Sequence, residues 1–156
     1  MMFVTVGTDP RGFDRLVRSV DEIATDYDDR IHAQIGCGDY IPENLEWSRF
    51  IDEDEIHELY RAATVVIAHA GAGTLLDALS YHKPIVVLPR QERHDEANDD
   101  HQRELARALA DHPAVFVIWD TNELGTTLNR ARRQSGGSGG RDDSLNRFLA
   151  NYIDSI

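Results

Sequence analysis

Lysine, cysteine and long apolar runs are scarce in this chain of 156 residues. Lys83 is the single lysine among 16 basic residues, so arginine carries almost every positive charge. Cys37 is the single cysteine, which excludes an internal disulfide and a metal site built on cysteines. This cysteine usage favours a reducing, cytoplasmic compartment. Since no apolar run approaches the roughly 18 residues of a membrane-spanning helix, we expect no direct membrane insertion.

Positive charge is scarce as well. The chain has 28 acidic and 16 basic residues, and its formal net charge is -12. Because an acidic surface repels phosphate backbones and anionic lipids, we expect no nucleic-acid partner. The many aspartates and arginines fit either adaptation to high salt or a genome rich in G and C, and both explanations stay open.

Apolar segments typical of buried strands alternate with segments that have apolar residues at helical spacing. This alternation predicts an α/β fold with a doubly wound, mostly parallel, Rossmann-like sheet, whose ligands lie at the carboxyl ends of the strands. The expected strands are 2–7, 31–36, 45–51, 64–69, 83–89 and 114–119, and the expected helices are 13–27, 52–63, 73–82, 99–112 and 121–133.

Composition divides the chain into three parts. Hydrophobic residues make up 41% of the sequence, enough for one domain with a buried core, which we place at 1–134. The stretch SGGSGG at 135–140 is typical of a flexible linker. The segment 141–156 has the pattern of an amphipathic helix, which needs an apolar surface to cover. That surface belongs either to its own domain or to a partner subunit.

The stretch HAGAGT at 69–74 follows a predicted strand and precedes a predicted helix. Gly71 and Gly73 let the backbone come close to a ligand, and a helix start offers free N–H groups to an anion. His69 and Thr74 can donate further hydrogen bonds to phosphate oxygens. The stretch matches neither a Walker A loop nor G-x-G-x-x-G. The alternative is a tight packing turn in which His69 is a buried polar group with its hydrogen bonds satisfied.

Other residues are predicted at the same edge of the sheet. Asp77 lies one helical turn after Gly73 and can accept ribose hydroxyls, unless it is an ordinary surface acid near a helix start. The segment 89–102 is longer than a crossover needs, and long loops often carry function. Gln102 could contact sugar hydroxyls there, or it could complete a helix-capping pattern with Asp99.

Metal binding is not favoured. His94 and His101 have aspartates nearby, but their spacing is not HExxH and no cysteine supports a zinc site. Asp52 and Asp54 precede a predicted helix, and we interpret Asp52 as its cap rather than as a metal ligand. The turn after the first strand, Gly7-Thr8-Asp9, is a second place where the backbone could approach phosphate or a partner domain.

Together these residues resemble the donor-binding half of GT-B glycosyltransferases of family 28, whose fold has two Rossmann-like domains. The chain is similar to the small one-domain members of that family over residues 2 to about 133. These members are soluble subunits of two-part UDP-sugar transferases, such as the dolichyl-diphosphate-GlcNAc GlcNAc-transferase and the PssE-type enzymes. The matching positions are His69, Gly71, Gly73, Thr74, Asp77, Lys83-Pro84, Pro89 and Gln102.

The resemblance implies roles for residues along the expected donor site, with a UDP-sugar as substrate and no metal or other cofactor. Asp77 would hold the ribose, Phe50 and Ile51 would meet the uracil, and Asp100 and Gln102 would contact the sugar. The donor diphosphate would be held by His69, Gly71, Ala72, Gly73 and Thr74, with Gly7 and Thr8 lining the cleft.

A single Rossmann-like domain is half of a GT-B enzyme. The resemblance implies that a membrane-anchored partner subunit supplies the acceptor domain and the catalytic base, and that the acceptor is a polyprenyl-diphosphate-linked sugar at the cytosolic face. We therefore expect the donor-binding, catalytic subunit of an inverting glycosyltransferase, which transfers little or no sugar alone. The alternatives are a nucleotide-binding assembly module without transfer activity and another doubly wound enzyme that binds NAD.

Overall fold

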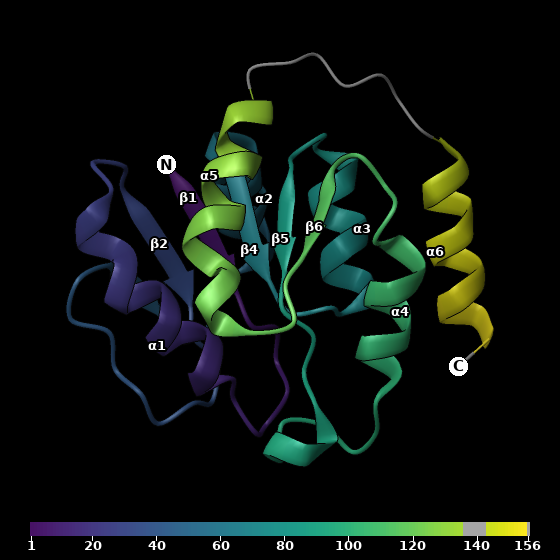
Figure 1. Ribbon diagram of the computed structural model, residues 1–156, viewed down its shortest axis with the longest axis horizontal. Helices are drawn as coiled ribbons and strands as arrows, with labels where there is room; N and C mark the ends of the chain where they lie inside the picture. The colour runs from purple at the N-terminus through teal and green to yellow at the C-terminus, as the bar shows by residue number, and fades with distance from the viewer. Residues whose placement is uncertain (136–142, 156) are drawn as a thin grey trace.

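The computed structural model describes residues 1–135 and 143–155 and contains one sheet of six parallel strands in the order β3-β2-β1-β4-β5-β6 (Figure 1). Every strand pair is parallel, as the alternation of strands and helices predicts. The strands are β1 (Met2–Thr5), β2 (Ile31–Gln34), β3 (Glu46–Ser48), β4 (Val65–Ala68), β5 (Ile85–Val87) and β6 (Val115–Val117).

The direction of winding changes between β1 and β4. Met2 of β1 pairs with Ile31 of β2 on one side and with Val65 of β4 on the other. The chain moves outward from β1 through β2 and β3, returns to β4, and continues outward through β5 and β6. In a doubly wound sheet, the loops that leave such a neighbouring pair separate and leave a crevice at the carboxyl edge, where ligands bind.

Helices cover both faces of the sheet. α1 and α5 pack on one face, and α2, α3 and α4 pack on the other (Figure 1). Three short 3₁₀ helices lie at Ala24–Asp26, Glu92–His94 and Thr121–Glu123. The longer helices are α1 (Asp14–Ile23), α2 (Glu53–Ala62), α3 (Ala72–Ser80), α4 (His101–Leu109), α5 (Leu124–Gln134) and α6 (Asp143–Ser155).

Two apolar cores lie on the two faces of the sheet. In β1, Met2 and Val4 belong to the core under α1 and α5, while Phe3 belongs to the core under α2, α3 and α4. All three side chains are fully buried. Strands buried on both faces are continuous apolar runs rather than alternating ones, which is why the sequence pattern located them well.

The observed elements are shorter than the sequence pattern predicted. The expected strand 83–89 pairs only over Ile85–Val87, although Leu88 beyond it is also fully buried. The expected helix 13–27 ends at Ile23 and continues as a 3₁₀ turn. An apolar pattern in the sequence predicts which residues are buried, whereas the ends of a strand depend on backbone hydrogen bonds. Buried residues just beyond a strand therefore make the predicted strand too long.

The C-terminal helix α6 packs against α3. Leu149 is fully buried in the core that α2, α3 and α4 share, and the Tyr152 hydroxyl donates to the backbone oxygen of His101 over 3.3 Å. Of the two surfaces considered for this helix, the structure therefore has the helix on its own domain. The predicted linker at 135–140 falls almost wholly outside the described residues, so the division of the chain into parts stays a prediction.

Within residues 1–135 and 143–155, no helix has the length and apolar character that crossing a membrane requires.

Candidate functional site

The turns after β1 and β4 meet at the carboxyl edge of the sheet, where the winding changes direction. His69 directly follows β4, and Gly7 lies two residues after β1. A Cβ atom on Gly7 would lie only 2.7 Å from Nε2 of His69, and Gly7 has a φ of 71° that disfavours other residues. The His69 ring is therefore packed directly against the turn after β1, at the carboxyl edge of the sheet.

The two glycines of HAGAGT have different surroundings. A Cβ atom on Gly71 would lie 2.2 Å from Cε1 of His69, so the absence of a side chain there makes room for the ring. A Cβ atom on Gly73 would meet nothing within 4 Å. Gly71 therefore serves the packing of His69, and Gly73 borders open space in which a ligand can approach the backbone.

The N-terminus of α3 borders the same space. The helix begins at Ala72, and its N-cap residue Gly71 provides no side-chain hydrogen bond. Since the first helical N–H groups have no partner one turn earlier, those of Ala72, Gly73 and Thr74 are available to a ligand. Together with the positive end of the helix dipole, they form a place suited to an anion.

A hydrogen-bonded row of side chains lies behind this helix end. Nε2 of His69 is 3.2 Å from Oγ1 of Thr74, and Nδ1 of His69 is 3.2 Å from Nε2 of Gln102. Oε1 of Gln102 accepts from the backbone N–H groups of Ala70 and Arg90 over 3.2 and 3.1 Å. Gln102 comes from α4, 33 residues along the chain from His69, and joins the turn after β4 to the end of β5.

His69 is uncharged at neutral pH. Its burial, and secondarily the nearby Arg90 cation, lower the pKa of the imidazole from its ordinary 6.5 to about 4. The hydrogen bond from Gln102 and the charge of Asp9 oppose this shift only in part. A neutral imidazole has one N–H donor and one acceptor nitrogen, which matches the two partners that His69 has in the structure.

The long segment 89–102 is held by a buried arginine. Arg90 is fully buried, and its Nη2 donates to the backbone oxygen of Val6 over 2.6 Å. Its Nη1 donates to the backbone oxygens of Gly12 and Glu96. The guanidinium also lies over the Phe13 ring, 4.8 Å from its centre. One cation thus fixes the loop after β5 to the loop after β1.

Glu96 reinforces the same attachment. Its carboxylate accepts from Nε and Nη2 of Arg15 over 2.7 and 2.9 Å, and from the backbone N–H of Gln91 over 3.0 Å. Neither Arg90 nor Glu96 was among the site residues predicted from the sequence. The signal that could have found Arg90 was an arginine placed directly at the end of an apolar strand, a position where an unpaired charge is unfavourable.

The remaining predicted residues lie in the loops after β1 and β3 and along α3. Phe50, 54% exposed, and Ile51 lie between β3 and α2. Thr8 is exposed after β1. Asp77 lies on α3, where burial of its carboxyl group raises the pKa while His57 opposes the shift. The predicted roles of these residues toward a nucleotide stay predictions.

Asp100 and Gln102 differ in what they contact. Asp100 precedes α4, accepts from the backbone N–H of Glu92 over 3.2 Å and pairs with Arg103 at 3.3 Å. Only half of the capping pattern considered for Asp99 and Gln102 forms. Oδ1 of Asp99 accepts from the backbone N–H of His101 at the start of α4 over 3.1 Å, whereas the Gln102 amide is bound to the turn after β4.

No group of three or more His, Cys, Asp or Glu side chains among the described residues is placed to hold a metal ion. Asp52 caps α2, since its Oδ1 accepts from the backbone N–H of Glu55 over 2.9 Å. The capping interpretation of Asp52 is therefore confirmed. His101 is exposed, and its hydrogen bond with Glu104, together with the nearby charge of Asp99, raises its pKa.

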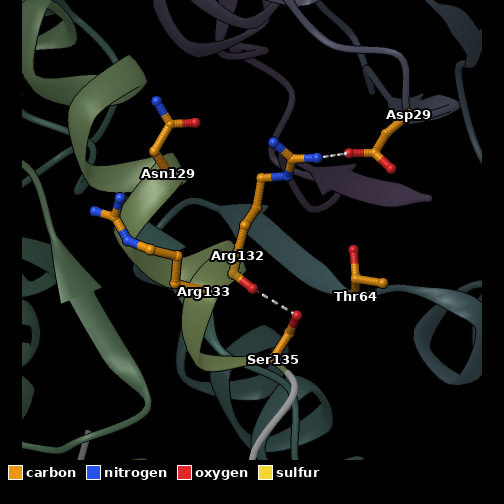
Figure 2. Close-up of a pocket in the computed structure, with 6 residues that line it drawn as sticks. All are labelled: Asp29, Thr64, Asn129, Arg132, Arg133 and Ser135. Carbon is orange, nitrogen blue, oxygen red and sulfur yellow. Dashed lines mark hydrogen bonds and ion pairs between the residues drawn. The ribbon is translucent and has the colours of Figure 1, made fainter.

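A separate hollow of about 440 Å³ lies at the amino edge of the sheet, where the strands begin. Figure 2 shows its lining, in which Arg132 of α5 points to Asp29 and forms an ion pair with it. The Ser135 hydroxyl donates to the backbone oxygen of Arg132 over 2.7 Å. Thr64, just before β4, and Arg133 complete the wall. None of the residues predicted for donor binding lies here.

Known proteins resemble the chain in sequence. Human UDP-N-acetylglucosamine transferase subunit ALG13 is 32% identical over 154 residues, which cover 92% of this chain and 13% of that protein. The UDP-N-acetylglucosamine–N-acetylmuramyl-(pentapeptide) pyrophosphoryl-undecaprenol N-acetylglucosamine transferase of Geobacter sulfurreducens is 35% identical over 80 residues, covering 51% of this chain and 21% of the enzyme.

Solved structures share the fold. The calicheamicin glycosyltransferase CalG4 matches 86% of this chain and 35% of its own with a TM-score of 0.65 and 16% identity. MurG of Acinetobacter baumannii matches 85% of this chain and 43% of its own with a TM-score of 0.58 and 24% identity. The chain spans less than half the length of these four proteins.

The glycosyltransferase family 28 C-terminal domain model matches residues 1–132, which include the whole sheet and the HAGAGT turn. The chain therefore belongs to glycosyltransferase family 28, as a domain of its C-terminal type.

Proposed function

We propose that the chain binds the donor of a UDP-sugar-dependent glycosyltransferase and forms the donor-binding, catalytic part of that enzyme. One observation carries the proposal: an uncapped helix N-terminus opens at the switch point of the sheet beside two uncharged hydrogen-bonding side chains, His69 and Thr74. This arrangement suits a diphosphate, because N–H groups and a helix dipole stabilise negative charge without a metal ion. Membership of family 28 supports the assignment.

The diphosphate would lie against Gly73, where even an added Cβ atom would meet no protein atom within 4 Å. The N–H groups of Ala72, Gly73 and Thr74 would donate to its oxygens. During transfer the bond between the sugar and the diphosphate breaks, and negative charge develops on the leaving UDP. Donors aimed at that charge in advance lower the barrier, which is the chemical contribution that this chain can make.

The nucleoside and the sugar would extend to either side of the diphosphate. Asp77, one turn along α3, would accept the ribose hydroxyls, and the backbone at Phe50 and Ile51 would meet the uracil. Asp100 and Gln102 would contact the sugar. Gln102 carries two amide N–H bonds, and the contact with His69 uses one of them. The other remains for a sugar oxygen. UDP-N-acetylglucosamine is the first donor to test, because the names of both sequence relatives include N-acetylglucosamine transfer.

A second subunit would supply what this sheet lacks. The chain matches less than half of each related glycosyltransferase of known structure. Another domain would therefore bind the acceptor and supply the catalytic base. The human relative is named as a subunit, and the name of the Geobacter enzyme specifies an undecaprenol-linked acceptor. We infer a membrane-anchored partner and a polyprenyl-diphosphate-linked sugar acceptor, with this chain recruited to the cytosolic face of the membrane.

Calorimetric titration of the purified chain with UDP, GDP, ADP and NAD, at low and high salt, tests the proposal. We expect UDP to bind and His69→Ala to abolish the binding, while Arg133→Ala at the amino edge leaves it unchanged. Binding of NAD in place of UDP would contradict the proposal and favour a different doubly wound enzyme. If no nucleotide binds, this chain is not by itself a donor-binding subunit, and an assembly module becomes the better account.

A further inference from the structure

In the hydrogen-bonded row Gln102–His69–Thr74, the chemistry of the partners decides which group donates and which accepts. We call this order of donors and acceptors the direction of the row. Oε1 of Gln102 lies 3.2 Å from the backbone nitrogen of Ala70 and 3.1 Å from that of Arg90. Both nitrogens carry N–H groups, which can only donate. The oxygen of the Gln102 amide must therefore face the backbone, and the NH₂ group must face Nδ1 of His69.

This orientation fixes the proton on the imidazole. Because the Gln102 NH₂ group donates to Nδ1 of His69, that nitrogen must be the acceptor and carry no hydrogen. The buried ring is neutral, so its single N–H is at Nε2. Nε2 lies 3.2 Å from Oγ1 of Thr74, so the imidazole donates to the threonine hydroxyl.

The direction of the row continues into the open space at α3. Among the described residues, the Thr74 hydroxyl has His69 as its hydrogen-bond partner and accepts from it. Its own O–H bond is left to donate elsewhere. Thr74 lies in the first turn of α3, next to Gly73 and the open space that Gly73 borders.

We propose that Gln102 is a positioning residue that sets the tautomer of His69 and thereby turns the Thr74 hydroxyl proton toward the donor diphosphate. The phosphate half of this inference rests on the proposed function, whereas the tautomer follows from the protein alone. Reversing the row would make Nε2 of His69 an acceptor. The Thr74 hydroxyl would then donate to His69 and present only lone pairs to an anion.

The attachment of the 89–102 segment maintains this direction. The backbone N–H of Arg90 is one of the two donors to Gln102, and the Arg90 side chain is itself fixed by the backbone oxygens of Val6 and Gly12. Glu96 holds the same segment on Arg15 of α1. The loop therefore delivers a rigid backbone donor to Gln102, so that its amide has one favoured orientation.

The substitution Gln102→Glu tests the proposal. A carboxylate still accepts from the backbone N–H groups of Ala70 and Arg90, but it cannot donate to His69. We expect long-range ¹H–¹⁵N spectra to place the His69 proton on Nε2 in the wild type, and to show Nδ1 protonated in Gln102→Glu. UDP affinity should fall by about ten- to a hundredfold, because a charge-assisted hydrogen bond is lost and a lone pair faces the phosphate.

Three further variants make the result specific. Gln134→Glu makes the same charge change on an exposed glutamine of α5 and should leave both the His69 spectrum and UDP affinity unchanged. Gln102→Met keeps the length of the side chain without donor or acceptor, and we expect a mixture of both His69 tautomers. In Thr74→Val, which has no hydroxyl, replacing Gln102 should cost much less UDP affinity than in the wild type.

The outcomes separate this inference from the proposed function. A wild-type His69 with its proton on Nδ1, or a spectrum that Gln102→Glu does not change, would overturn the inference even if UDP binds. A wild type with the proton on Nε2 that does not bind UDP would overturn the donor site, and with it the role of the Thr74 hydroxyl. If Gln102→Glu costs the same UDP affinity in the wild type and in Thr74→Val, Gln102 does not act through the Thr74 hydroxyl.

Discussion

Each edge of the sheet contains an arginine, but the two arginines lie in different surroundings. At the carboxyl edge, Arg90 is fully buried and bonded to backbone oxygens of two loops. At the amino edge, the Arg132 side chain is 38% exposed and pairs with Asp29, whose side chain is 29% exposed (Figure 2). The hollow of about 440 Å³ belongs to the amino edge, while the uncapped end of α3 belongs to the carboxyl edge.

This difference is the physical reason for proposing the donor site at the carboxyl edge rather than at the hollow. A large hollow can be lined by side chains that are not held in one arrangement. The hollow at the amino edge is lined mostly by exposed polar side chains. At the carboxyl edge, each polar atom of His69 and the carbonyl oxygen of Gln102 have a defined partner. Such preorganised polar groups, rather than empty volume, distinguish a site that can bind a charged substrate.

Removing the two arginines should give the largest contrast. Arg90→Met leaves the backbone oxygens of Val6 and Gly12 without their donor, so we expect the free energy of unfolding to fall by about 2–6 kcal/mol, at roughly 1–3 kcal/mol for each unsatisfied acceptor. Arg132→Met removes a solvent-exposed ion pair and should cost less than about 1 kcal/mol. Urea unfolding of both variants at pH 7 measures the difference, and similar values for the two would contradict the contrast between the edges.

Acid should destabilise the carboxyl edge through His69. The folded state keeps this ring neutral down to a pH of about 4, whereas the unfolded chain protonates it near its ordinary pKa of 6.5. The unfolded state therefore binds more protons over this window, so His69 contributes its full stability above pH 6.5 and loses it as the pH falls toward 4. The total loss is about 3 kcal/mol at 1.36 kcal/mol per pKa unit.

A comparison of wild type with His69→Gln isolates that effect. Both proteins share the other six histidines and all carboxylates, so their unfolding free energies should diverge only through His69. Between pH 7 and pH 4 we expect the wild type to lose more stability than the variant. Parallel pH profiles would show that His69 titrates normally in the folded protein.

The two glycines of HAGAGT should respond in opposite directions to alanine. Gly71 has a φ of -81°, which any residue can adopt, so Gly71→Ala is unfavourable only because its Cβ meets the His69 ring, and it should cost about 1–3 kcal/mol. Gly73→Ala meets no protein atom and improves the helix, so it should stabilise the free protein by up to about 1 kcal/mol. Urea unfolding of both variants measures the two changes, and a loss of stability in Gly73→Ala would contradict the open space beside it.

Titration with UDP tests whether the open space beside Gly73 holds the diphosphate. Gly73→Ala should bind UDP about tenfold more weakly despite its greater stability, because the new methyl group enters the space proposed for the diphosphate and costs about 1.4 kcal/mol of binding. Undiminished binding by Gly73→Ala would place the diphosphate elsewhere.

The smallest expected effect concerns the ribose. Asp77→Asn keeps the shape of the side chain but weakens its acceptance of two hydroxyls, so we expect a loss of UDP affinity of about three- to tenfold, near 1 kcal/mol. The matched change Asp29→Asn, at the amino edge, should not alter UDP affinity. Calorimetry on both variants checks the pair, and an equal effect of the two would mean that net charge rather than contact is responsible.

Several features of the site were predictable from local sequence. An apolar run followed by HAGAGT and a helical pattern predicts a strand, a turn and an exposed helix start, and all three are present between β4 and α3. The cap at Asp52 was equally local. The different functions of Gly71 and Gly73 were not predictable, because they depend on which glycine the His69 ring packs against.

The sequence by itself determined the order of strands and helices, the burial of the central strands and the position of the glycine turn, because periodicity and backbone freedom act over a few neighbouring residues. Only the tertiary structure decided that β1 and β4 are adjacent, that Arg90 joins two loops, and that Gln102 reaches His69 across 33 residues. The direction of a hydrogen bond depends on donors and acceptors that the folded chain brings together, so it has no signature in local sequence.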